Sequence, residues 1–186
     1  FSRRIGVAKD KDGNTIENRI IAGARISGKI SNNLRLGFLN MQTDEDLKNA
    51  ISANNNLVFT LQQKVFSRSN IGLIFINREK TSNSNVLNNQ EKFNRVLGLD
   101  YNLLSKNSKW TANIHAHNSF SEIKKNSPYS IGSLFLYNTR NDNLRFKILK
   151  IGEGFESDLG FIMRNGIYKN ILRYERRFWI ENEKLR

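Results

Sequence analysis

Residues 110–117 have the sequence WTANIHAH, in which apolar and polar side chains alternate. In a β-strand, neighbouring side chains point to opposite faces, so Trp110, Ala112, Ile114 and Ala116 share one face and the polar residues between them share the other. A transmembrane β-strand needs roughly 9–11 tilted residues with this pattern, whereas strands of soluble sheets average roughly five or six. The length and alternation of this segment predict a strand of a membrane-type β-barrel.

Further segments with strand character lie on both sides of this one. The sequence predicts strands at residues 19–30, 34–42, 57–66, 70–78, 92–104, 109–118, 128–138, 144–151, 159–166 and 167–179. Short turns alternate with long polar loops, as expected when one end of a barrel carries tight turns and the other carries longer excursions. We therefore expect an all-β, antiparallel, up-and-down transmembrane-type β-barrel of about ten strands. Residues 1–18 are expected to be a linker and residues 19–186 the barrel domain.

Basic residues dominate the charge of the chain. Thirty Lys and Arg stand against 17 Asp and Glu, which gives a formal charge of +13. The basic residues are scattered at about one per expected strand, which favours a polar lumen over one nucleic-acid patch, so nucleic acid is not an expected partner. The candidate ligand-binding residues are polar groups of one strand face or of the barrel entrance: Arg3, Arg4, Arg25, Lys29, His115 and His117.

Several kinds of chemistry have no signature in this sequence. The chain has no cysteine, which excludes disulfides and thiolate sites. No glycine-rich nucleotide loop occurs, and His115 and His117 lack a convincing third metal ligand, so neither a cofactor nor a metal is expected. The mean hydropathy is −0.56, and no apolar run approaches the length of a transmembrane helix. A catalytic role is not expected for this segment.

Six short motifs resemble, in order, a bacterial outer-membrane family catalogued as domain of unknown function 5916. They are FSRRIG (1–6), GARISGK (23–29), LGFLN (36–40), NIG (70–72), GLD (98–100) and GFESDLGFIMR (154–164). The resemblance implies an outer-membrane β-barrel that stands behind a family-9-like carbohydrate-binding module in its relatives. It implies no catalytic residues. Residues 157 and 158, Ser-Asp, depart from a more Pro-Glu-like pair.

The resemblance further implies location in the outer membrane, contact with its lipid, and a role in glycan-linked surface binding or transport, with a glycan or other acidic ligand. The last residues, EKLR (183–186), lack the aromatic end typical of a closing strand, so the chain is expected to form an N-terminal part of the barrel. Two alternatives remain: a soluble basic β-domain that binds polyanions, and a glycan hydrolase that uses Glu153 and Glu156 as acid and base.

Overall fold

The computed structural model of the chain describes residues 4–10, 12–82 and 91–179. Within these ranges there is no α-helix, and the all-β prediction is confirmed. The strands are β1 (Val7–Lys9), β2 (Thr15–Glu17), β3 (Ile20–Lys29), β4 (Leu34–Thr43), β5 (Asn54–Val65), β6 (Ser69–Lys80), β7 (Phe93–Leu104), β8 (Trp110–Ser121), β9 (Tyr129–Asn138), β10 (Asp142–Ile151) and β11 (Ile167–Arg176).

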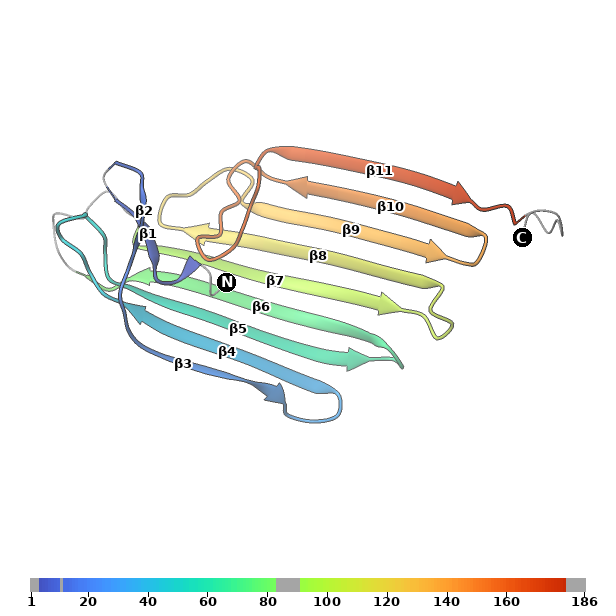
Figure 1. Cartoon of the computed structure of the whole chain (residues 1–186), viewed down its shortest axis with the longest axis horizontal. Coiled ribbons are helices and arrows are strands. Elements are labelled where there is room, and N and C mark those ends of the chain that lie inside the picture. The colour runs from blue at the N-terminus through green and yellow to red at the C-terminus, as the bar shows by residue number, and fades with distance from the viewer. Residues whose placement is uncertain (1–3, 11, 83–90, 180–186) are drawn as a thin grey trace, which may run out of the picture.

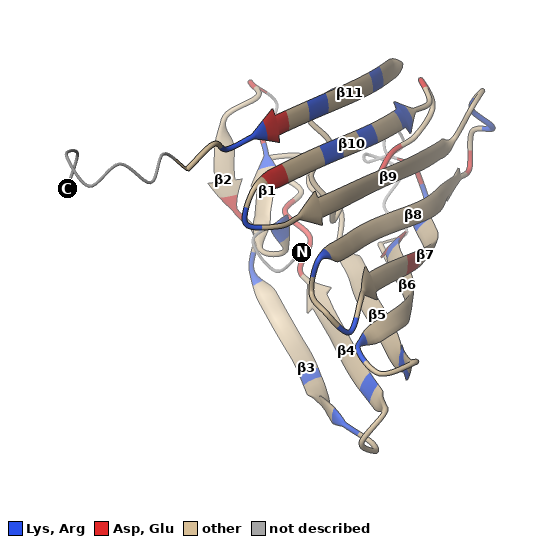
Figure 2. Cartoon of the chain, turned by 90° about the vertical axis from the view of Figure 1, so that its right-hand side faces the viewer, with Lys and Arg blue, Asp and Glu red and all other residues tan. Residues whose placement is uncertain are grey.

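Strands β3 to β11 form one 9-stranded antiparallel sheet in which every strand pairs with its neighbours in sequence (Figure 1). The up-and-down topology is therefore confirmed. Among the described strands, β3 and β11 are the two edges, so the sheet is open and is not a closed barrel. Figure 2 shows the sheet curling, with β3 and β11 at its opposite margins. The segment predicted as a linker contains β1 and β2, which pair as a separate antiparallel ribbon.

The strands of the sheet are long and closely matched in register. Strands β5 to β8 have 12 residues each, and Val58, Ile76 and Val96 stand directly opposite one another across β5, β6 and β7. Such cross-strand pairs of β-branched side chains stabilise a sheet. Alternation of apolar and polar residues fixes the register, because a slip by one residue would move every side chain to the wrong face.

The two ends of the sheet differ in their connections. Short turns at residues 30–33, 66–68, 105–109 and 139–141 lie at one end, which we call the tight-turn end. At the other, the long-loop end, connections at 44–53, 122–128 and 152–166 join the strands, and β6 ends and β7 begins at the same end. Phe66 and Ser108 adopt positive φ of 55° and 57° in the tight turns. The short turns keep consecutive strands adjacent.

The core is small and lies on one face of the sheet, near the long-loop end. Its buried members come from three strands, from the N-terminal segment and from the connection 152–166: Ile5, Val58, Ile76, Val96, Phe155 and Leu159. The apolar side chains that cover this part of the sheet therefore come from outside it.

The prediction of a strand at 159–166 is wrong. These residues belong to the irregular connection between β10 and β11, in which Leu159 is buried against the sheet and Gly166 has a φ of 66°. Leu159 and Ile162 pack against the core on the face of the sheet, whereas Phe161 and Met163 are exposed. None of these residues pairs with an edge strand. The sheet has nine strands instead of about ten for this reason.

Candidate functional site

The register of the sheet assigns each strand side chain to one of two faces. Residues directly opposite each other share a face, and the next residue along each strand lies on the other. His117 stands opposite Gly98 and Ser130, so all three lie on one face, whereas Ala116 and Leu99 lie on the other.

One face, which we call the basic face, carries most of the strand charges. Its cationic members are Arg25, Lys29, Arg35, Lys64, Arg78, Lys80, Arg145, Lys147, Lys169 and Arg173. The carboxylates on this face of the described strands are Asp100 and Glu175, and Glu175 forms an ion pair with Arg173. Figure 2 shows Lys and Arg spaced along β3, β10 and β11. The basic face is thus strongly electropositive.

The opposite, apolar face is aliphatic and aromatic along the middle of the strands. Representative members are Ile26, Phe38, Phe59, Leu73, Leu99, Ile114, Ile131, Phe146 and Leu172. Many of these side chains are exposed, with Leu99 at 56% and Leu172 at 72% of full accessibility. The apolar face therefore has no protein cover among the described residues.

Aromatic side chains border the apolar face at both ends. At the tight-turn end, the rings of Trp110 and Tyr137 lie 4.6 Å apart, and Tyr174 follows two strands further along. At the long-loop end, Arg95 lies over the ring of Phe93 at 4.5 Å and Lys150 lies over the ring of Tyr129 at 5.4 Å. Phe120 and Tyr168 belong to the same border. The charged groups of this face stay near its ends.

The two histidines lie together near the middle of the basic face. Their ring centroids are 5.1 Å apart. His117 Nε2 lies 3.2 Å from Asp100 Oδ1, and His115 Nε2 lies 3.5 Å from Ser130 Oγ. Each ring occupies space left by a glycine, because a Cβ at Gly98 would lie 2.2 Å from His117 Cδ2 and one at Gly132 would lie 2.4 Å from His115 Cε1.

The other predicted ligand-binding residues are spread over the sheet. Arg25 lines a hollow of about 330 Å³ on β3 to β5, and Lys29 lies at the tight-turn end. Arg4 lies at the long-loop end, where its guanidinium stacks over Phe161 at 5.6 Å. Arg3 falls outside the described residues. The structure brings His115 and His117 together but does not join them to Arg4 or Lys29 in one site.

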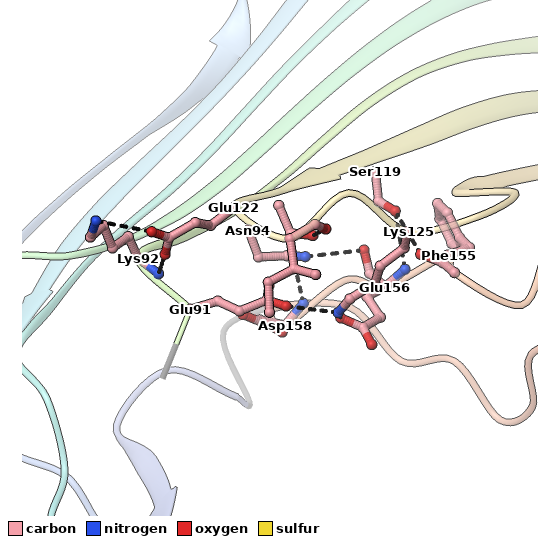
Figure 3. A network of polar contacts seen from close by, with 12 residues as sticks. Glu91, Lys92, Asn94, Ser119, Glu122, Lys125, Phe155, Glu156 and Asp158 are labelled. Carbon is pink, nitrogen blue, oxygen red and sulfur yellow. Dashed lines mark hydrogen bonds and ion pairs between the residues drawn. The ribbon is translucent and has the colours of Figure 1, made fainter. Parts of the chain in front are cut away.

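The connection 152–166 folds over the basic face at the long-loop end, and we call it the inward loop. Asn94, 1% exposed, holds its backbone from both sides: Asn94 Nδ2 donates to Glu156 O at 3.4 Å, and Asp158 N donates to Asn94 Oδ1 at 3.1 Å (Figure 3). Glu156 N donates to Ser119 Oγ at 3.1 Å. Two strands thus fix the backbone of this loop.

Ion pairs add to these backbone contacts. Arg78 Nε lies 2.5 Å from Asp158 Oδ2, and Arg78 also donates to Asn54 Oδ1 at 3.1 Å. Lys125 pairs with Glu156 and, at 2.8 Å, with Glu91. Burial alone would lower the pKa of Lys125, but its hydrogen bonds to these two carboxylates raise that pKa above the usual lysine value. The inward loop is therefore held by charge as well as by apolar packing.

A cavity of about 370 Å³ lies between the inward loop, the ribbon segment and the sheet. Glu91, Glu156 and Asp158 line it together with Arg78. The partners of these carboxylates are cations, since Lys125 holds Glu91 and Glu156 while Arg78 holds Asp158. These ion pairs fit a structural role, and we call the pair of Arg78 and Asp158 the latch because it ties the inward loop to the sheet. The pairing gives no support to Glu156 as a free catalytic acid.

The candidate ligand-binding residues chosen from the sequence included none of the cations of β10 and β11. Arg145 and Lys147 alternate with apolar residues in β10, as Lys169 and Arg173 do in β11. Their alternate spacing already puts each pair on one face, but only the strand order reveals that both pairs share the face of His115.

No cluster of three or more metal-ligating side chains occurs in the described ranges. In the part of the chain that the structure describes, no helix has the length and apolar character needed to cross a bilayer.

Comparisons with protein-family models, with curated proteins and with solved structures find no match to this chain.

Proposed function

We propose that the sheet forms part of the wall of an outer-membrane β-barrel whose apolar face contacts lipid and whose basic face lines the interior. In this proposal the barrel belongs to the family catalogued as domain of unknown function 5916. It takes part in glycan-linked surface binding or transport, with acidic ligands drawn to the interior. Further strands paired to the edges of β3 and β11 complete the wall.

The extent of the apolar face is the observation that carries this proposal. A sheet of 9 strands spaced about 4.8 Å apart is roughly 40 Å wide. With an apolar band about 25 Å tall, as in barrels, the uncovered surface is on the order of 1,000 Å². The largest apolar patch of a typical soluble monomer measures roughly 300–600 Å². Lipid is the cover that suits so broad a band.

The aromatic residues at both ends of the apolar face also support contact with a bilayer. Trp and Tyr rings favour the boundary between hydrocarbon and water, and barrels carry aromatic girdles at both interfaces. Trp110, Tyr137 and Tyr174 form one border, and Phe93, Phe120, Tyr129 and Tyr168 form the other. Arg95 and Lys150 lie beyond the aliphatic band, where a long cationic side chain reaches water.

The cations of the basic face support the second half of the proposal, although the same face carries the small apolar core of Val58, Ile76 and Val96 near the long-loop end. A wall with an apolar outer face and charged groups on its inner face is compatible with a water-filled barrel. An excess of cations in an enclosed space concentrates anionic solutes and speeds their entry. Acidic saccharides would therefore be favoured over neutral or cationic ones.

Depth-dependent fluorescence quenching tests the assigned faces. In a Trp179→Phe background, Trp110 is the remaining tryptophan, and vesicles with brominated acyl chains should quench it after refolding. The matched control adds Trp110→Phe and Thr111→Trp, which moves the ring to the basic face, and its quenching should be weak. Equal quenching of both proteins, or of neither, would count against a lipid-facing apolar face.

A further inference from the structure

A second hollow on the basic face lies at the tight-turn end, away from the histidines. It has a volume of about 280 Å³ and lies between the β3–β4 turn, the β5–β6 turn and the adjoining strand ends. Its cationic lining consists of Lys29, Arg35, Lys64 and Arg68, and its lining includes no carboxylate. We call this hollow the cationic cleft.

The cations of the cleft lack anionic partners in the described protein. None of the four forms an ion pair with a described Asp or Glu, although carboxylates elsewhere pair with Arg78, Lys92 and Lys125. Lys29 and Arg35 stand directly opposite each other in the β3–β4 pair. Like charges in that position destabilise a sheet, and an anion bound between them would offset their repulsion.

The cleft also holds donors in fixed positions. Arg68 Nη1 donates to Ser108 Oγ at 2.6 Å and to Lys106 O at 3.3 Å, which fixes the guanidinium against the neighbouring turn. Asn70 Oδ1 accepts hydrogen bonds from Gln62 at 2.9 Å and from Asn102 at 3.0 Å. These two bonds fix the orientation of the Asn70 amide, and its N–H groups are the donors that could reach a ligand.

We infer that the cationic cleft binds phosphate groups, carried by a free phosphorylated molecule or by a lipid headgroup. Two arginines match the geometry of a phosphate through paired N–H donors, and two lysines add point charges. The inference rests on the proposed function in one respect: it names phosphate as the acidic group that the interior would bind. Binding to the cleft itself requires only that the sheet is folded.

Titration calorimetry with inorganic pyrophosphate tests this inference on the full chain, in whichever medium keeps it folded. The double variant R35Q/K64Q should weaken binding by about tenfold or more, because it removes two charge-assisted contacts. The charge-matched control K48Q/K109Q removes two exposed cations outside the cleft and should change affinity by less than about threefold. The variant R35K/K64R keeps both charges and should retain binding, and circular dichroism verifies that each variant folds.

Vesicles with and without lipid A distinguish the two phosphate sources. Binding to pyrophosphate that depends on the cleft identifies a soluble ligand, and cleft-dependent binding to lipid A vesicles alone identifies a headgroup. Equal losses in R35Q/K64Q and K48Q/K109Q would overturn the inference, because net charge alone would then explain binding. Cleft-dependent binding by a protein that folds in plain buffer would contradict the membrane proposal, but the inference that the cleft binds phosphate would stand.

Discussion

The ring of His117 lies against the backbone of Gly98, its direct partner across β7 and β8. A Cβ at Gly98 would stand 2.2 Å from His117 Cδ2 and 2.8 Å from Ile74 Cγ2. The absence of a side chain at Gly98 therefore permits His117 to lie flat on the basic face within reach of Asp100.

Substitution of Gly98 by alanine should destabilise the folded sheet by about 1–3 kcal/mol, because overpacking forces the histidine or the strand to move. Chemical denaturation measures the loss. The variant Gly28→Ala is the control, since a Cβ there meets nothing within 4 Å. The double variant G98A/H117A should recover much of the loss, and no recovery would show that the ring is not the obstacle.

Removal of the Asn94 side chain should release the inward loop. Asn94 is almost fully buried and bonds the loop backbone at Glu156 and Asp158, so Asn94→Ala should cost about 1–3 kcal/mol. Limited trypsin digestion monitors cleavage after Arg164, an exposed residue of the inward loop. Cleavage there should accelerate in the variant, and an unchanged rate would argue against the role of Asn94 as a clamp.

The pair of Arg78 and Asp158 should show energetic coupling. A double-mutant cycle with Arg78→Gln and Asp158→Asn should give a coupling of about 1–2 kcal/mol, because Asp158 is partly exposed and solvent weakens the attraction. Additive effects of the two substitutions would contradict the latch. The exposed pair of Lys92 and Glu122 is the comparison and should give a smaller coupling.

The ion pairs of Lys125 should make stability depend on alkaline pH. Because the folded-state pKa of Lys125 is raised, its stabilising contribution is complete below the unfolded pKa of about 10.4 and is lost as pH rises through the folded-state value. The variant Lys125→Met should be less stable than the parent at neutral pH, and this difference should shrink above about pH 10.4. A constant difference across that range would reject the titration of Lys125 as its cause.

The alternation in residues 110–117 was enough to predict β8 and the assignment of its side chains to two faces, because the strand period acts locally. The inward loop could not be predicted in this way. Its contacts join Asp158 to Arg78 and Asn94, which are 80 and 64 residues away in sequence. The convergence of basic residues from β3 to β11 likewise depends on strand order, so charges that look scattered along the sequence share one face.

A charge placed on the apolar face should disfavour insertion into a bilayer. Leu99→Arg lies midway along β7 and should cost about 2–4 kcal/mol of stability in lipid. Asn113→Arg places the same charge on the basic face of β8 and should be tolerated. Refolding yields into phospholipid vesicles, measured by protease protection, compare the two variants. Equal yields would mean that the two faces do not differ in their environment.

The environment of the apolar face can be tested most directly by far-UV circular dichroism and size-exclusion chromatography of the purified chain, with and without detergent. A lipid-facing wall predicts a folded β signal and a single species only in detergent or lipid, with aggregation in plain buffer. A monodisperse β-protein in plain buffer would contradict the membrane proposal and would favour a soluble basic domain.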